Sequence, residues 1–253
     1  MAIDKFVSTV SYFKPFFHWS CHTIANPGAE PTHQGYLNTE CMYGAIEFIQ
    51  SLRDAVGTNG TAIMWSPYER TQLRNLREWL VTREAGDHRS LVNWINDLTG
   101  DDRDEVLPTA PRLVDQHALV PKHWFHPRMG GRTSIKVALP AALAVASSTR
   151  IDRWLRTAGL LDPQTGLRPD NPYLLLPSLD VPGLTDDDTD DDPATSVTDG
   201  VEAMRAYQDM VYGRHMNNRE RRDQIRDALN RYCRLDTLAQ VIIWEHWRTK
   251  VRL

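Results

Sequence analysis

The sequence predicts an α/β domain built around a mixed central sheet. Three observations support this. The first forty residues contain runs rich in aromatic and β-branched side chains, such as FFHWSCHTI at Phe16–Ile24. Short apolar runs bounded by turn residues then alternate with segments of helical periodicity. A long segment near the C-terminus carries one apolar stripe. Alternating strands and helices favour helices packed on a sheet.

The first half supplies most of the strands. Strands are expected at Lys5–Tyr12 and Phe16–Ile24, with a partner strand from Gly35 after a turn at Asn26–Gly28. Thr39 is a candidate N-cap for a helix that ends near Ala55. Further elements are expected in the order strand, helix, helix, strand: Thr61–Trp65, a helix from about Arg70, Ser90–Leu98 and Arg112–Asp115.

The second half is expected to be helical around an irregular excursion. Ser134 is a candidate cap for a helix over Ile135–Leu139 that Pro140 would stop. Residues 159–199 are rich in proline and include the acidic run Thr185–Pro193, which predicts a loop-rich excursion. A helix is expected over Val201–Tyr212. We interpret residues 1–253 as a single domain.

The C-terminal helix, predicted over Arg221–Trp247, carries a carboxylate on its apolar stripe. Asp236 lies one turn after Tyr232, where packing alone would favour leucine. The stripe consists of Ile225, Leu229, Tyr232, Ala239, Ile243 and Trp247.

Composition limits the classes of function. The net charge of −4 argues against a protein that coats nucleic acid unspecifically, so any such contact would use a local basic patch. No apolar run is long enough for a transmembrane helix, and the N-terminus lacks a signal-peptide layout, so no membrane partner is expected. Three cysteines without a CxxC pair fit a reducing cytoplasm.

Three acids predict a metal site. Glu69 and Asp115 follow predicted strands, and Asp236 lies on the helix stripe. Clustered carboxylates favour Mg²⁺ or Mn²⁺, and two such ions stabilise both oxygens in phosphodiester cleavage. Tyr232 is a candidate for orienting the attacking water. Candidate phosphate contacts are Arg132, Lys136, Arg221 and Arg222.

A structural role stays open for each acid. The helix dipole alone favours Glu69 at a helix start, Asp115 fits an N-cap, and Asp236 fits a structural polar network.

Particular runs resemble known families. The spacing in YCRLD, Tyr232 to Asp236, resembles the third motif of DnaQ-like DEDDy exonucleases. The chain also resembles a bacterial domain-of-unknown-function family, number 2779, thought to be ribonuclease-H-like. The matching runs are MWSPYERTQL, RLVDQHAL, HPRMGGRTSIKVALP, TDGVEAM and LNRYCRLDTLA.

The resemblance implies a ribonuclease-H-like mixed sheet flanked by helices. It also implies a 3′–5′ exonuclease activity whose substrate is single-stranded rather than duplex nucleic acid. Glu69 would be the second motif's carboxylate, Asp115 a further acid, and Asp236 the last acid with Tyr232 as its partner.

The front of the chain departs from that pattern. Such nucleases carry an aspartate-x-glutamate pair on the first strand, whereas here Asp4 is followed by Lys5 and Phe6. Asp4 is therefore the only candidate metal ligand in this segment. The alternative is a catalytically inactive relative that binds nucleic acid or protein.

Overall fold

The computed structural model describes residues 2–5, 16–40, 44–82, 86–100, 111–177 and 200–250, and for residues 2–5 and 200–202 the backbone alone. The acidic run Thr185–Pro193 and most of the predicted strand Lys5–Tyr12 lie outside these ranges.

The N-terminal strands form an antiparallel sheet in the order β1-β2-β3. Their bounds are β1 (Ala2–Lys5), β2 (Phe16–Thr23) and β3 (Thr32–Leu37). In the central strand, His18 lies opposite Asp4 on one side and Leu37 on the other. Residues 16–21 are all buried, because helices cover both faces of β2. The predicted strand at 16–24 and its partner are confirmed.

A second, parallel sheet follows α1 (Ala45–Val56) and pairs β4 (Ala62–Met64) with β5 (Leu113–Asp115). The crossover between these strands contains α2 (Tyr68–Thr82) and α3 (Arg89–Thr99). Two boundaries differ from expectation. Helix α1 begins after Gly44 rather than after Thr39, and α2 begins early enough to place Glu69 in its first turn.

Short helices lead from β5 into a helical layer. They are η1 (His117–Leu119), α4 (Val120–His123), η2 (Pro127–Met129), α5 (Ile135–Val145), α6 (Thr149–Thr157) and η3 (Pro172–Leu175). The prediction that Pro140 ends a helix is wrong, because α5 continues to Val145. Proline costs a backbone hydrogen bond there, but both sides of it are buried, at Ala138, Leu139, Ala141, Ala142 and Leu143.

Two helices close the described chain, α7 (Gly200–Val211) and α8 (Arg219–Lys250). The predicted stripe of α8 is confirmed: five of its members are buried and Trp247 is half-buried. From Thr237 to Ile243 every residue of α8 is buried, because this part of the helix lies inside the molecule.

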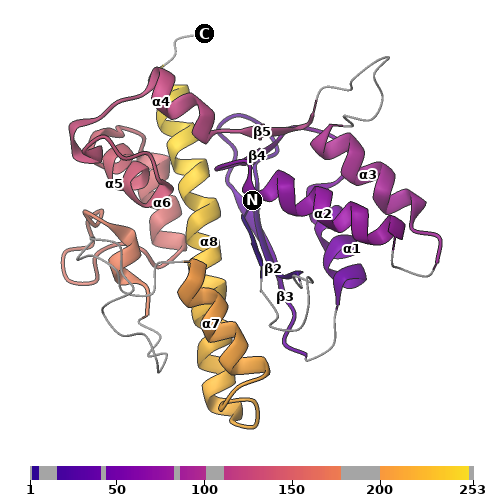
Figure 1. The fold of residues 1–253 in the computed structure, drawn as a ribbon. Coiled ribbons are helices and arrows are strands. Elements are labelled where there is room, and N and C mark those ends of the chain that lie inside the picture. The colour runs from indigo at the N-terminus through magenta and orange to yellow at the C-terminus, as the bar shows by residue number, and fades with distance from the viewer. Residues whose placement is uncertain are drawn as a thin grey trace.

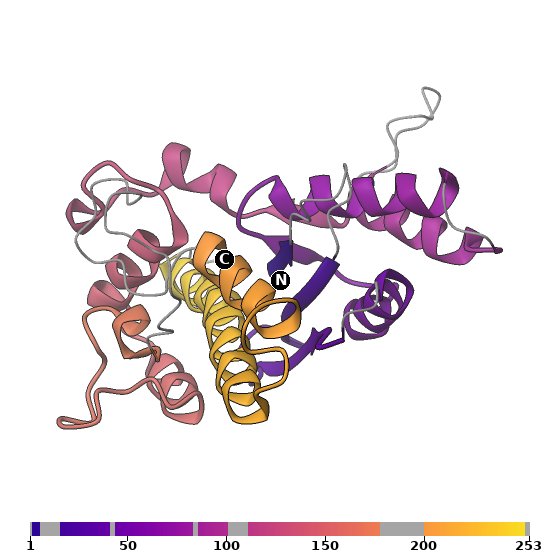
Figure 2. The same ribbon diagram turned by 60° about the horizontal axis from the view of Figure 1, so that its bottom comes forward.

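Figures 1 and 2 show α8 running through the middle of the molecule. The sheets and α1, α2 and α3 lie on one side of it, and α5 and α6 lie on the other. Helix α8 packs against β2, β3, α5 and α7. The long helix therefore links the sheet half to the helical half.

The structure confirms the mixed α/β class. A single central mixed sheet is not what the described residues form, since their antiparallel and parallel strands make two separate sheets. Among the helices described, none combines the length and apolar character needed to cross a membrane.

Candidate functional site

Asp236 is half-buried on α8 and accepts a hydrogen bond from a tyrosine that the sequence did not suggest. The hydroxyl of Tyr173 in η3 donates to its Oδ1 at 2.7 Å. Burial, and then the charge of Asp236, hold the pKa of Tyr173 well above 10, so this hydroxyl stays a donor. Tyr232, the predicted partner, is buried in the core cluster beside Leu229 and Leu235. Tyr173 and Asp236 are 63 positions apart, so no local spacing rule could reveal their contact.

Glu69 and Asp115 follow the carboxyl ends of the two parallel strands. Glu69 is buried in the first turn of α2, and Asp115 is the last residue of β5, directly opposite Met64. The backbone N–H of Ala118 donates to Asp115 Oδ1 at 3.3 Å, so Asp115 also caps the η1 turn. Both positions fit the dipole and capping roles that the sequence left open.

These strand ends lie against α8 close to Asp236. Gln116, which follows Asp115, donates its Nε2 to the backbone oxygen of Gln240 at 3.3 Å, one turn beyond Asp236. Trp65, which follows β4, packs in a core cluster with Ile243 of the same helix. The residues that follow β4 and β5 therefore contact α8 at Ile243 and Gln240, two turns and one turn beyond Asp236.

The acids themselves are not gathered into a preformed ion site by the described residues. In the described ranges, no three His, Cys, Asp or Glu side chains lie close enough together to hold a metal ion. Asp4 belongs to β1, which is described by its backbone alone. An ion held by Glu69, Asp115 and Asp236 would therefore require these side chains to move closer together, with Asp4 or water completing its shell.

The predicted phosphate contacts fall in two places. Arg132 is exposed and Lys136 half-buried at the start of α5, in a segment tied to the end of β5 by a 2.8 Å contact between His117 Nε2 and Thr133 Oγ1. Arg221 and Arg222 lie in the first turn of α8, 14 or 15 residues before Asp236. At 1.5 Å per residue that is about 21 Å along the helix axis. The structure therefore places the two pairs at different distances from the acids.

A ladder of polar side chains joins β2 to α8, and the sequence analysis treated this segment only as a strand. His18, Ser20 and His22 alternate along β2 and so face the same way. His18 Nδ1 lies 3.2 Å from Cys233 Sγ, Ser20 Oγ 3.1 Å from Thr237 Oγ1, and His22 Nδ1 2.8 Å from the same Thr237 oxygen. Polar residues at every second position of an otherwise bulky strand are the signal that would have revealed it.

The histidines of the ladder are neutral near pH 7. Burial, followed by the charge of His33, lowers the pKa of His18 and of His22 from 6.5 to about 3. Burial also lowers the pKa of His33 to about 4, and its Nε2 contacts Ser20 Oγ at 2.9 Å. Ser20 and Thr237 are each 1 % exposed. The ladder holds the sheet to α8.

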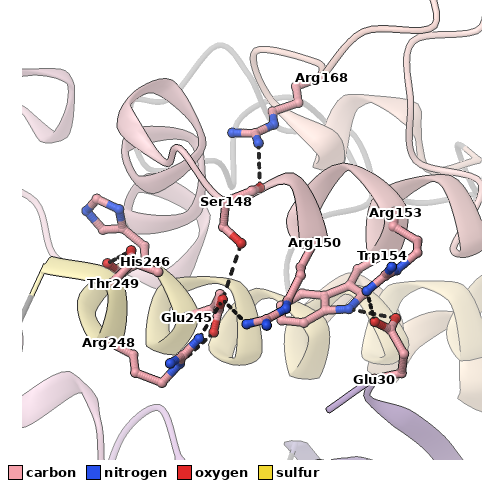
Figure 3. A network of polar contacts seen from close by, with 10 residues as sticks. All are labelled: Glu30, Ser148, Arg150, Arg153, Trp154, Arg168, Glu245, His246, Arg248 and Thr249. Carbon is pink, nitrogen blue, oxygen red and sulfur yellow. Dashed lines mark hydrogen bonds and ion pairs between the residues drawn. The ribbon is translucent and has the colours of Figure 1, made fainter. Parts of the chain in front are cut away.

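Glu245, near the C-terminal end of α8, is a buried carboxylate whose oxygens both accept hydrogen bonds (Figure 3). It accepts from Arg248 Nε at 2.8 Å, from Ser148 Oγ at 3.2 Å and from an Arg150 nitrogen at 3.3 Å. Burial alone would raise the pKa of Glu245, but these donors together lower it. The carboxylate therefore stays charged and ties α6 to α8.

With this geometry in place, comparison with known families gives one match. The family described as Domain of unknown function (DUF2779) matches residues 1–134. This is more than half of the chain. The chain belongs to the DUF2779 family.

The DUF2779 match covers one part of the candidate site. It includes both sheets, and with them Asp4, Glu69, Asp115 and Arg132. Asp236, Tyr173 and all of α8 lie outside the matched range. No curated protein and no solved structure matches the chain.

Proposed function

We propose that this DUF2779 protein is a metal-dependent nuclease of the DnaQ-like type, which hydrolyses phosphodiester bonds of single-stranded nucleic acid from the 3′ end. The observation that supports this most is the meeting of the β4 and β5 ends with α8. The Gln116–Gln240 contact brings the segment after Asp115 to α8 one turn beyond Asp236. Ligands bind at the carboxyl ends of parallel strands in open α/β sheets, so acids there are well placed for chemistry.

A ribonuclease-H-like fold, with one mixed sheet, is part of this proposal. The described residues contain both kinds of pairing that such a sheet combines, but in two separate sheets, antiparallel β1-β2-β3 and parallel β4-β5. Helices lie on both sides of these strands (Figure 1). The buried free thiols of Cys21 and Cys233 are consistent with the reducing cytoplasm that we propose as its compartment.

The proposed ligands are Glu69, Asp115 and Asp236, with Asp4 from β1 as a fourth. A divalent ion held by these oxygens would stabilise charge on the phosphate. The contribution of the chain itself is to position the acids. Arg70 fixes the start of α2 by donating to the Leu113 carbonyl at 2.7 Å, and Tyr173 orients Asp236.

An inactive relative that binds nucleic acid is the second candidate. Phe6 stands where the resemblance implies a glutamate. In addition, Asp236 already accepts a hydrogen bond from Tyr173, which gives it a structural role.

A cleavage assay separates the two candidates. Purified protein with Mn²⁺ is incubated with 5′-labelled single-stranded DNA and RNA. A nuclease shortens the strands from the 3′ end, and Glu69→Gln, Asp115→Asn and Asp236→Asn each lower the rate by at least about 100-fold. Asp54→Asn, at an exposed position of α1, is the matched control and leaves the rate unchanged. Intact substrate in every sample, with strand binding retained, would favour the inactive relative.

A further inference from the structure

A cavity of about 540 Å³ lies where the end of α7 meets the start of α8. Its walls include Arg219, Arg222 and Arg226 from α8, together with Asn217, Asp223 and Thr39. The three arginines are spaced at three and four residues, so they lie on one side of the first two turns of the helix. Three guanidinium groups therefore face one cavity, and among the described residues that line it Asp223 alone has a carboxylate.

The charge of Arg222 is held in place without being neutralised. One of its nitrogens donates to the Thr39 backbone oxygen at 2.7 Å, and another donates to the Met216 backbone oxygen at 3.4 Å. Both acceptors are uncharged carbonyl groups. This fixes the guanidinium at the wall of the cavity and leaves its positive charge available to an anion.

The other two arginines differ in how far they are neutralised. Arg226 forms ion pairs with Asp223 at 2.7 Å and with Asp227 at 3.1 Å. Arg219 is exposed and forms no ion pair with any residue that the structure describes. The cavity thus keeps an excess of positive charge, carried by Arg219 and Arg222.

We propose that this arginine pocket, Arg219, Arg222 and Arg226, binds a backbone phosphate of the nucleic-acid strand. One guanidinium group can donate two parallel hydrogen bonds to a phosphate. An arginine that is already fixed in place loses little conformational entropy when it binds the phosphate. The nucleic-acid part of this assignment rests on the proposed function.

The arginines of the pocket and Asp236 lie on the same helix, α8. Arg222 precedes Asp236 by about 21 Å along the axis of α8. At ~3.4 Å per nucleotide of a stacked strand, that distance corresponds to about six nucleotides, and to fewer in an extended strand. The pocket therefore holds a strand several nucleotides away from its reacting end, so that strands too short to span this distance bind more weakly.

Binding is measured in EDTA, by fluorescence anisotropy with a labelled 12-nucleotide single strand and by calorimetry with pyrophosphate. The variant is Arg219→Gln/Arg226→Gln, which keeps the structural bonds of Arg222. We expect the strand to bind at least about 10-fold more weakly. The slope of log affinity against log salt should fall by about 0.7, which corresponds to the contact of Arg219, because Arg226 is already paired with Asp223 and Asp227. Arg156→Gln, at an exposed position of α6, should change neither quantity.

Unfolding midpoints check that the variants are folded, and Arg219→Gln alone repeats the test with an exposed residue. Unchanged strand affinity and salt slope would overturn the proposal, even if pyrophosphate still binds, because the pocket would then hold free phosphate only. Metal is absent, so the assay is independent of cleavage. If the strand binds through the pocket but is not cut when Mn²⁺ is present, the proposed nuclease activity is wrong and the proposed phosphate binding by the pocket is supported.

Discussion

The hydroxyl of Tyr173 accounts for how Asp236 is accommodated on a buried helix face. Its 2.7 Å bond to a half-buried carboxylate is a hydrogen bond to a charged group. Such bonds stabilise proteins by about 1.5–3 kcal/mol. Asp236 is therefore positioned by a residue from a different helical segment.

Tyr173→Phe tests this contact. We expect the free energy of unfolding, measured by urea denaturation, to fall by about 1.5–3 kcal/mol, because Asp236 loses its donor. Tyr36→Phe is the control, since the Tyr36 hydroxyl forms no hydrogen bond in the described part of the chain. Equal losses in both variants would show that the Tyr173 bond contributes nothing specific.

His18 makes stability depend on pH. Its pKa is about 3 in the folded chain and 6.5 as a free side chain, so the unfolded chain binds the proton first. The contribution of neutral His18 to the free energy of unfolding is fully present above pH 6.5 and is lost as the pH falls toward 3. At pH 5 the loss from His18 is 1.5 pH units at 1.36 kcal/mol each, or about 2 kcal/mol.

His18→Asn removes this titration and keeps a polar side chain. Between pH 7 and pH 5 the unfolding free energy of both proteins should fall. We predict that the fall is about 2 kcal/mol smaller in the variant than in the unmodified chain. Denaturant titrations at the two pH values measure it. An unchanged pH dependence would mean that His18 is not buried in its neutral form.

Helix α8 is the element on which both halves depend. One side of it meets the histidine ladder of β2, and near its C-terminal end Glu245 binds Ser148 and Arg150 from the α6 region (Figure 3). Of the two arginines that pair with Glu245, Arg150 is 40 % exposed and Arg248 30 %. Solvent screening therefore weakens the attraction between Glu245 and each of these two arginines.

Glu245→Gln should lower the free energy of unfolding by on the order of 1–3 kcal/mol, because two arginines lose their counter-charge. The contribution should persist down to pH 4.5, since the pKa of Glu245 is lowered from that value, and should be lost as the pH falls further. Thermal unfolding of the variant beside Glu47→Gln, an exposed position of α1, measures it. If the two variants unfold alike, Glu245 does not hold α6 to α8.

Elements with a clear period were predictable from the sequence. Helix α8 was, because its stripe repeats at steps of three, four and seven residues over about six turns. Strand β4 was, because its short apolar run stands between turn residues. The extension of α5 through Pro140 was not, because tertiary burial outweighs one lost hydrogen bond. Helix α6 was not predicted, because it lies between the helix expected to stop at Pro140 and the excursion expected from residue 159, in residues to which no element was assigned.

At the scale of the whole molecule, the candidate site depends on contacts between distant parts of the chain. The sequence placed Asp115 at the end of a strand and Asp236 on a helix, as the structure has them, whereas Glu69 lies in the first turn of α2 rather than at a strand end. It gave no sign of the Tyr173–Asp236 or Gln116–Gln240 contacts, which join residues 63 and 124 positions apart. The alternating polar residues of β2 indicate the ladder, but not its partners on α8, about 215 positions away. Local periodicity contains no information about such pairings, since they follow from how the halves pack on α8.

We propose that the ends of β4 and β5 and the middle of α8 form one metal-dependent site. The most direct test is anomalous X-ray diffraction from crystals of the intact chain soaked in Mn²⁺. We predict an anomalous peak within about 2.0–2.4 Å of carboxylate oxygens from Glu69, Asp115 or Asp236, and its loss in crystals of Asp236→Asn. Crystals saturated with Mn²⁺ that show no peak at these three carboxylates would contradict the account.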